Sequence, residues 1–272
     1  MIKFLNAAFF QFSPDPRVAF EIFGLEIYWY GIIMSFAIVT AFLTAGFFMK
    51  KVGFRNEIVY EILLIVVPLG ILGARLLFLL CTPGESLTNF FNFRDGGIAI
   101  WGAILFGALG IFIYTRFVRR CSFFAVSDIV ALGVILAQSI GRWGNFFNEE
   151  LYGLETGFHF FPLTVMVGVT PHLALFFYES ILNLIGFLIL LKVFSRQKKY
   201  GTTTAVYLLI YGIVRSALEL FRDPKFIMDS PGFPVSFAFA IAAIVCGIVL
   251  LILSKYDKLD QRDIALRANK ET

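Results

Sequence analysis

Long apolar stretches separated by short polar connectors run through almost all of the 272-residue chain. An α-helix rises about 1.5 Å per residue, so about 20 apolar residues cross a hydrocarbon core about 30 Å thick. This pattern predicts an all-α integral membrane protein, a bundle of about seven transmembrane helices in which residues 1–272 form one membrane domain. The predicted spans are approximately 27–49, 58–80, 97–115, 123–140, 172–194, 203–221 and 233–254.

The composition excludes an ordinary soluble domain. Hydrophobic residues make up 59 % of the chain and charged residues only 15 %, whereas about 25 % of residues in soluble proteins are charged. The three cysteines stand far apart, without the spacing of a zinc site or a disulfide framework, and no basic cluster suited to nucleic acid is present. Residues 1–23 carry four charged side chains and lack the apolar core of a cleavable signal peptide.

Connectors rich in lysine and arginine alternate along the chain with connectors that contain few basic residues. Fifteen of the 23 basic residues follow the first, third, fifth and seventh spans, and only six precede the first span or follow an even-numbered one. Cytoplasmic connectors are enriched in lysine and arginine. The amino terminus is therefore predicted to lie outside, the carboxyl terminus in the cytoplasm, and residues 141–171 in a loop on the outer face.

The segment Gly141–Gly153 (GRWGNFFNEELYG) concentrates polar side chains at the outer end of the fourth span. Glycine lets the backbone approach a ligand closely, and Asn145 and Asn148 can both donate and accept hydrogen bonds. The planar guanidinium of Arg142 matches a phosphate group, and Glu150 adds a carboxylate. A connector needs few of these residues merely to turn, so the pattern favours a binding site over an ordinary polar loop.

The sixth predicted span carries a polar stripe within an apolar helix. Tyr211, Arg215 and Glu219 are spaced four residues apart, and Arg222 follows about one turn later, so all four are expected on one helical face. A charge within a membrane span costs at least about 2.5 kcal/mol. A functional stripe is therefore favoured over a pair of charges that only neutralises itself.

Other polar positions carry weaker signals. Tyr30 opens the first span, where an aromatic belt explains such a residue without any chemistry. Arg75 and Asp128 lie within the second and fourth spans, and a structural ion pair and a substrate role are equally open for them. Neither of the two histidines has a partner at metal-ligand spacing, so no metal site is expected.

Four segments of the chain together resemble one family. GRWGNFFNEELYG is similar to the signature of the bacterial prolipoprotein diacylglyceryl transferases, which is close to G-R-x-G-N-F-x-N-x-E-x-x-G. The WYG at Trp29–Gly31 and the DGGIAI at Asp95–Ile100 fit further family segments, and the first of these gives more weight to Tyr30. The family's YG-xx-R-xxx-E-xx-R-xP is matched in the sixth span by Tyr211, Gly212, Arg215, Glu219, Arg222 and Pro224.

The resemblance implies a multi-pass enzyme of the bacterial inner membrane. Its reaction would move the diacylglyceryl group of phosphatidylglycerol to the lipobox cysteine thiol of a preprolipoprotein, forming a thioether as the first step of lipoprotein maturation. No metal or organic cofactor is implied. The catalytic residues would be Arg142 and Arg215, which bind the donor phosphate, together with Tyr30, Tyr211 or Glu150, among which the sequence does not choose a base. Further substrate-binding residues would be Asn145, Asn148, Gly153, Glu219 and Arg222.

The chain departs from the family pattern at two places. Trp101 stands where the family often has histidine, and an indole cannot act as a base, so a general-base role is not carried over to this position. In Pro171–Ser180 the histidine and proline of the family motif are exchanged and residues are inserted, so only Tyr178 and Glu179 align. These departures leave open a divergent lipid-binding paralogue with altered catalysis. A transporter is the other rival, although no internal repeat is evident, and a purely structural protein would leave the polar crowding unexplained.

Overall fold

The computed structural model describes residues 15–23, 25–55, 57–82, 85–92, 97, 99–227, 229–230 and 233–255. Its contacts divide the described chain into two compact units. One unit contains the residues up to Thr44 together with those from Val130 onward, and the other contains Ala45–Ile129. Helices α1 (Trp29–Lys51) and α4 (Phe123–Phe147) each contribute residues to both units.

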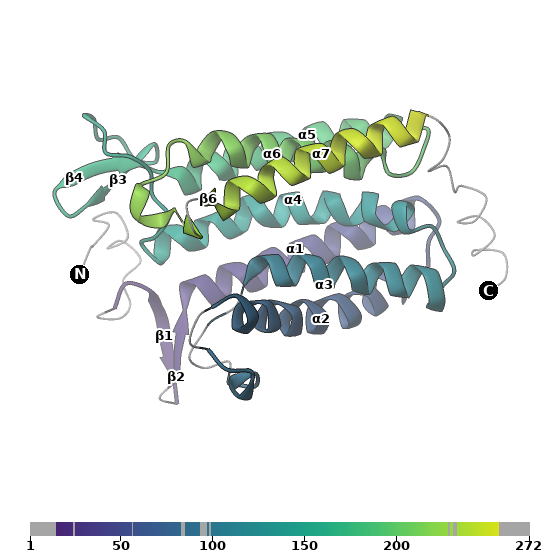
Figure 1. Cartoon of the computed structure of the whole chain (residues 1–272), viewed down its shortest axis with the longest axis horizontal. Coiled ribbons are helices and arrows are strands. Elements are labelled where there is room, and N and C mark those ends of the chain that lie inside the picture. Colours follow the sequence, from purple (N-terminus) through teal and green to yellow (C-terminus); the bar gives the residue numbers. More distant parts are fainter. Residues whose placement is uncertain are drawn as a thin grey trace. The chain divides into compact units, whose positions relative to one another are not determined.

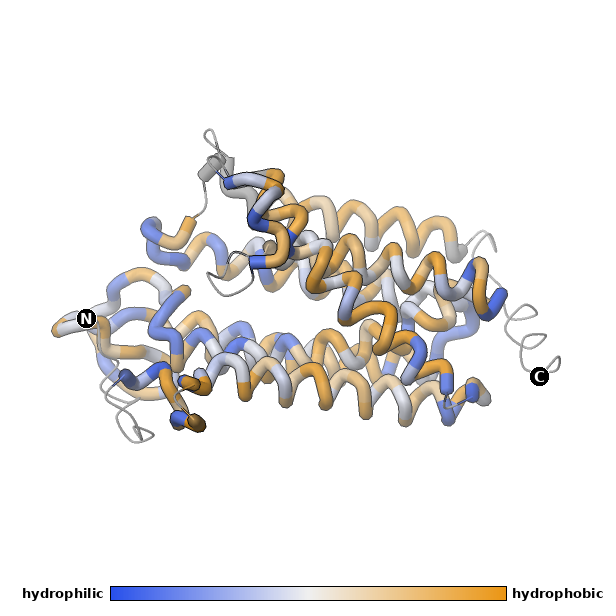
Figure 2. The backbone as a smooth tube through the Cα atoms, turned by 90° about the horizontal axis from the view of Figure 1, so that it is seen from below, coloured by the Kyte–Doolittle hydropathy of each residue, from blue (hydrophilic) through white to orange (hydrophobic). Residues whose placement is uncertain are grey.

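The first unit is a group of long helices with small hairpins at their ends. Helices α5, α6 and α7 run side by side in Figure 1. The short connector at 197–201 joins α5 to α6. The helical parts of the chain are mostly in the hydrophobic colour, as Figure 2 shows. Beyond its parts of α1 and α4, the unit contains β1 (Val18–Ile22), β2 (Leu25–Tyr28), β3 (Thr164–Val167), β4 (Thr170–Leu173), α5 (Leu175–Arg196), α6 (Thr202–Glu219), η4 (Pro224–Phe226), β5 (Asp229–Ser230), β6 (Phe233–Pro234) and α7 (Val235–Lys255).

Close helix packing in this unit depends on glycine. A Cβ atom on Gly133 of α4 would lie 2.6 Å from the main-chain oxygen of Ala41 in α1. A Cβ on Gly212 of α6 would lie equally close, at 2.6 Å, to the main-chain oxygen of Ala240 in α7. Small residues of this kind let helix backbones approach in a membrane, where the hydrophobic effect does not drive helices together.

The second unit is built on a helical pair, α2 (Glu57–Cys81) and α3 (Ile100–Ile113), with the short η2 (Leu87–Asn89) between them. A π-helical turn, η3 (Tyr114–Val118), extends α3 and brings both Tyr114 and Arg119 onto the carboxylate of Glu61. At the other end of α2, Arg75 donates hydrogen bonds to the main-chain oxygens of Gly97 (2.9 Å) and Asn89 (2.7 Å). The side chain of Arg75 thus binds two points of the connector between α2 and α3.

Among the described residues, five helices are long and apolar enough to cross a membrane: α1, α2, α4, α5 and α7. This confirms a multi-pass, mostly helical membrane protein. The apolar part of α3 and η3, Gly102–Val118, is shorter, and α6 is less apolar because it contains three threonines, two tyrosines, an arginine and a glutamate. Each predicted span nevertheless coincides with a helix.

Several predicted boundaries were wrong. Helix α4 continues to Phe147 rather than ending at Ile140, so the first seven residues of the signature are helical and the connector begins at Asn148. The predicted outer-face loop contains the β3–β4 hairpin, and His172 belongs to β4 rather than to the fifth span. Sequence hydropathy missed these limits because the signature mixes aromatic residues with polar ones, which lowers its hydropathy without breaking the helix.

Candidate functional site

Main-chain hydrogen bonds bring together the end of α4, the beginning of α5 and the end of α6. The Gly153 N–H donates to the carbonyl of Leu173 (2.8 Å), and the Leu154 N–H donates to the carbonyl of Phe221 (2.9 Å). Gly153 also forms an isolated β-bridge with Arg222. A side chain on Gly153 has no room, because its Cβ would lie 2.6 Å from the Phe221 oxygen. The predicted substrate-binding glycine therefore joins two motifs that are distant in the sequence.

A sharp turn at the end of α4 positions the carboxylate of Glu150. Glu149 adopts a left-handed conformation (φ 54°), while the N–H groups of Glu149 and Glu150 return to the carbonyls of Phe146 (3.2 Å) and Asn145 (3.1 Å), the pattern of a Schellman cap. The Glu150 Oε1 atom then accepts hydrogen bonds from the amides of Asn145 (3.0 Å) and Asn148 (3.3 Å). Three predicted site residues thus form one hydrogen-bonded group.

A buried carboxylate from α5 connects the two principal arginines. The Oε1 atom of Glu179 lies 2.6 Å from Nη2 of Arg142, and its Oε2 atom lies 3.7 Å from Nη1 of Arg215. The other terminal nitrogen of Arg142, Nη1, donates a long hydrogen bond of 3.5 Å to Asn145 Oδ1. Glu179 therefore holds guanidinium groups from α4 and α6 on the two sides of one carboxylate.

A second carboxylate extends the network. Glu219 Oε2 lies 3.4 Å from both Arg215 Nη2 and Arg222 Nη1, and Arg215 Nη2 also donates to Ser236 Oγ at 3.2 Å. Because α6 ends at Glu219, Arg222 is not on the helical stripe predicted from spacing but on the segment that follows. From this segment Arg222 still contacts the carboxylate of Glu219.

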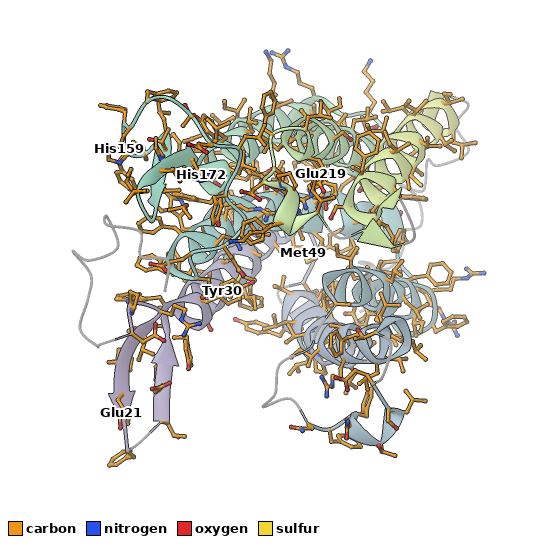
Figure 3. All side chains as sticks on the ribbon, turned by 60° about the vertical axis from the view of Figure 1, so that its left-hand side comes forward. Glu21, Tyr30, Met49, His159, His172 and Glu219 are labelled. Atoms are coloured by element: carbon orange, nitrogen blue, oxygen red, sulfur yellow. The ribbon has the colours of Figure 1, made fainter. Side chains whose placement is uncertain are left out.

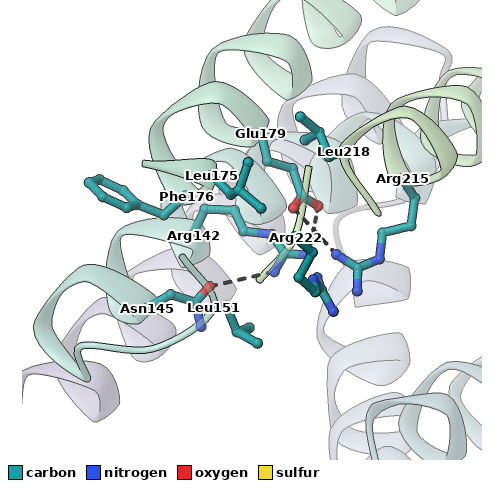
Figure 4. Close-up of a pocket in the computed structure, with 9 residues that line it drawn as sticks. All are labelled: Arg142, Asn145, Leu151, Leu175, Phe176, Glu179, Arg215, Leu218 and Arg222. Carbon is teal, nitrogen blue, oxygen red and sulfur yellow. Dashed lines mark hydrogen bonds and ion pairs between the residues drawn. The ribbon is translucent and has the colours of Figure 1, made fainter. Parts of the chain in front are cut away.

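Several of these side chains line a small pocket, shown in Figure 4. Its lining residues are Arg142, Asn145, Leu151, Leu175, Phe176, Glu179, Arg215, Leu218 and Arg222. Within the part of the chain that the structure describes, Nη1 of Arg215 and Nε of Arg222 are buried without a hydrogen-bond partner. A buried guanidinium N–H without an acceptor costs free energy, and an anion in the pocket would supply that acceptor.

The residues that line the pocket carry more positive than negative charge. They include three arginines and one carboxylate, that of Glu179, while Glu219 and Glu150 contact lining residues without lining the pocket themselves. Burial, followed by the nearby charge of Arg215, lowers the pKa of Arg222 to about 10, so its guanidinium remains charged at neutral pH. A bound anion would favour this charged form.

The structure places the other predicted residues around this pocket. The ring of Tyr30 lies against the backbone of Gly144, since a Cβ on that glycine would be 2.7 Å from the ring. Tyr211 lies one turn from Arg215 and stacks on Tyr207, with ring centroids 6.2 Å apart. Tyr30, Tyr211 and Glu150 are absent from the residues that line the pocket itself.

Sequence reasoning missed the central position of Glu179 and the contact of Ser236. A signal for Glu179 was present, because a single acidic residue stands in the apolar first half of the fifth predicted span, and such a residue requires a partner. No comparable signal marks Ser236, because one serine in an apolar helix is ordinary.

The two histidines are not among the residues that line the pocket. His159 and His172 both lie on the connector between α4 and α5 (Figure 3). The Nδ1 and Nε2 atoms of His172 are 2.9 Å from the Gly153 oxygen and 3.1 Å from the Thr170 hydroxyl.

Trp101 lies in α3, but its side chain is not among those that the structure describes. Asp95 and Gly96 of the DGGIAI segment are also outside the described residues.

Apolar helices long enough to cross a membrane, together with an arginine-rich pocket, define a multi-pass membrane protein with a buried, polar pocket. Comparison with known sequences gives the family. The chain belongs to the prolipoprotein diacylglyceryl transferase family, whose model matches residues 17–253.

Similar proteins share most of this length. A protein of Clostridioides difficile (strain 630) is 37 % identical over 250 residues, which cover 89 % of this chain and 97 % of that protein. A protein of Finegoldia magna is 33 % identical over 247 residues, 89 % of this chain and 96 % of that protein. One of Clostridium kluyveri is 35 % identical over 218 residues, 76 % of this chain and 85 % of that protein. Each is named phosphatidylglycerol–prolipoprotein diacylglyceryl transferase.

Proposed function

We propose that this chain is a transferase that moves the diacylglyceryl group of phosphatidylglycerol to a prolipoprotein, at the lipobox cysteine. The observation that carries the proposal is the pocket of three arginines, two of which have buried N–H groups without a hydrogen-bond partner among the described residues. Such forks suit a phosphodiester, which accepts paired hydrogen bonds from guanidinium groups. The names of the family and of the similar proteins indicate phosphatidylglycerol as the donor and a prolipoprotein as the acceptor.

The chemistry requires stabilisation of a leaving phosphate. The cysteine thiolate attacks the glyceryl carbon next to the phosphate, so that a C–S bond forms while the C–O bond breaks. The electron pair of that bond leaves with glycerol phosphate, on which negative charge accumulates. Cationic groups already fixed in a low-dielectric site stabilise such charge most effectively.

The residue roles in this proposal follow the contacts around the pocket. Arg142 and Arg215 bind the phosphodiester, and Arg222 adds the third positive charge. Glu179 orients Arg142 and Arg215, and Glu219 orients Arg215 and Arg222. The group Asn145, Asn148 and Glu150 holds the donor headgroup.

A base must take the proton of the acceptor thiol, whose ordinary pKa is about 8.5. Tyr30, Tyr211 and Glu150 are the candidates. Glu150 accepts a hydrogen bond from the pocket-lining Asn145, Tyr211 lies one helical turn from Arg215, and Tyr30 lies against Gly144. The surplus of positive charge in the pocket also favours the thiolate without a dedicated base.

We further propose seven spans, with the amino terminus outside and the carboxyl terminus in the cytoplasm, in the bacterial inner membrane. The alternation of basic connectors supports this orientation. Residues 1–272 are proposed to act as one membrane domain, because α1 and α4 each contribute to both compact units.

The orientation predicts which connectors a reagent outside the cell can reach. In a variant without the three native cysteines, a cysteine at Glu155 should react with a membrane-impermeant maleimide on intact cells. A cysteine at Lys198 should react only after the cells are opened. The opposite pattern would refute the proposed orientation.

The transferase activity can be measured directly. Purified protein in phosphatidylglycerol vesicles should add diacylglyceryl to a lipobox peptide, as a mass increase on the cysteine. A peptide with serine in place of that cysteine, and vesicles of phosphatidylcholine alone, are the controls and should give no product. Binding of phosphatidylglycerol without transfer would instead indicate a lipid-binding paralogue, and neither binding nor transfer would favour the transporter.

A further inference from the structure

A second set of polar side chains lies one helical turn deeper than the arginine pocket. Gln138 precedes Arg142 by four residues on α4, and Asn183 follows Glu179 by four residues on α5. Residues four apart share a helical face and differ by about 6 Å along the axis. Both side chains therefore lie below the pocket, towards the middle of their helices.

The side-chain amides of these two residues are incompletely paired. Asn183 is 1 % exposed, and its Nδ2 atom has no hydrogen-bond partner within the described ranges. Gln138 donates to the hydroxyl of Tyr207 at 3.0 Å, but its Oε1 atom is buried and likewise has no partner there. In a hydrocarbon environment no water compensates such groups, and each costs about 1–3 kcal/mol.

Apolar packing closes the polar layer from below. Gly186, three residues beyond Asn183, lies between two apolar side chains, since its Cβ would be 2.7 Å from Ile135 and 2.9 Å from Ile210. These isoleucines belong to α4 and α6, so three helices meet at this level. The polar layer is thus a limited region between the arginine pocket and a hydrocarbon-like interior.

We infer that the Asn183 side chain is a further donor-binding group, which donates a hydrogen bond to an ester carbonyl of the diacylglyceryl group. This inference rests on the proposed function, because it extends the same donor site inward. In a phospholipid the ester carbonyls lie a few covalent bonds below the phosphate, a separation comparable to the rise of four helical residues, about 6 Å. A phosphodiester held by Arg142 and Arg215 places these carbonyls at the depth of Asn183.

The chemistry of the two groups matches. An ester carbonyl only accepts hydrogen bonds, and the amide nitrogen of asparagine only donates them. Polar groups beneath a phosphate site therefore distinguish a diester lipid from an ether lipid of the same shape. A buried site that hydrogen-bonds a substrate group discriminates against the analogue lacking that group.

The test compares two donors in the full-length protein. The wild-type chain should use diester phosphatidylglycerol about three- to tenfold better than its diether analogue, the effect of about one buried hydrogen bond. Asn183→Leu, which keeps the branched shape but is larger, should lower kcat/KM for the diester by that factor and leave the diether rate unchanged. Should the leucine variant fail to insert, Asn183→Ala, which needs no additional space, permits the same comparison.

Ser139→Ala is the matched control. It also removes a buried polar contact between α4 and α5, the hydrogen bond from Ser139 Oγ to the Ser180 oxygen (2.8 Å), but it should not change the ratio of the two donors. Equal losses with both donors in the Asn183 variants would overturn the ester-binding role and leave only a structural one. If the wild-type chain transfers from neither donor, the proposed function itself fails, and the ester site with it.

Discussion

Replacement of Arg142 by lysine is expected to lower the rate of diacylglyceryl transfer by at least about tenfold, nearly as much as replacement by alanine. The two terminal nitrogens of Arg142 contact different partners, Glu179 at 2.6 Å and Asn145 at 3.5 Å. A single ammonium group cannot keep both contacts and also present a planar fork to a phosphodiester. A tenfold loss corresponds to about 1.4 kcal/mol of activation free energy.

The measurement is kcat/KM for transfer from phosphatidylglycerol to a lipobox peptide, with thermal stability recorded for each variant. Arg196→Lys, at the exposed far end of α5, is the control and should retain full activity. Near-normal activity of Arg142→Lys would mean that position 142 supplies only general positive charge, and the bidentate phosphate contact would have to be abandoned.

Glu179→Gln is expected to have an effect of at least comparable size. The amide presents one acceptor and one donor where the carboxylate presents an acceptor to each arginine. One of Arg142 and Arg215 then faces an N–H group instead of an oxygen. Loss of one partner from a buried charge network typically costs about 3–5 kcal/mol, and here it would also disorder two phosphate-binding groups.

A kinetic readout separates orientation from stability. If Glu179 orients the arginines, the glutamine variant should lose activity even where thermal unfolding shows it folded, and Glu179→Asp should recover part of it. Glu155→Gln removes an exposed carboxylate from the connector between α4 and α5 and should leave the activity unchanged. A folded Glu179→Gln variant with full activity would show that the two arginines find their geometry without the shared carboxylate.

The sequence predicted the positions of the helices well, because spanning segments must be long and apolar and this leaves a strong signal. It predicted their ends less well. At the end of α4, the aromatic residues of the signature remain helical although the polar residues among them lower hydropathy. The left-handed turn at Glu149 could not be anticipated either, because this conformation usually favours glycine.

Of the predicted site residues, the structure brings Arg142, Asn145, Arg215 and Arg222 into one pocket, but most contacts among the charged groups were not predicted. Gly141–Gly153 and the residues from Tyr211 to Arg222 were identified by their unusual polarity within apolar surroundings. Which charge pairs with which depends on tertiary packing, and spacing alone suggested only the Arg215–Glu219 contact. The central role of Glu179 follows from the placement of α5 against α4 and α6, which no local pattern contains.

The bridging carboxylate has a consequence for the insertion of this protein into the membrane. Charged side chains oppose the transfer of a helix into lipid by about 2.5–3.5 kcal/mol each near its centre. Glu179 of α5 finds a partner in Arg142 of α4, the helix that is synthesised immediately before it. Helix α6 then arrives with Arg215 and Glu219 already one turn apart on the same helix. Helices α5 and α6 can therefore enter the bilayer with these charges already paired, and the arginine pocket is completed when Arg215 also reaches Glu179.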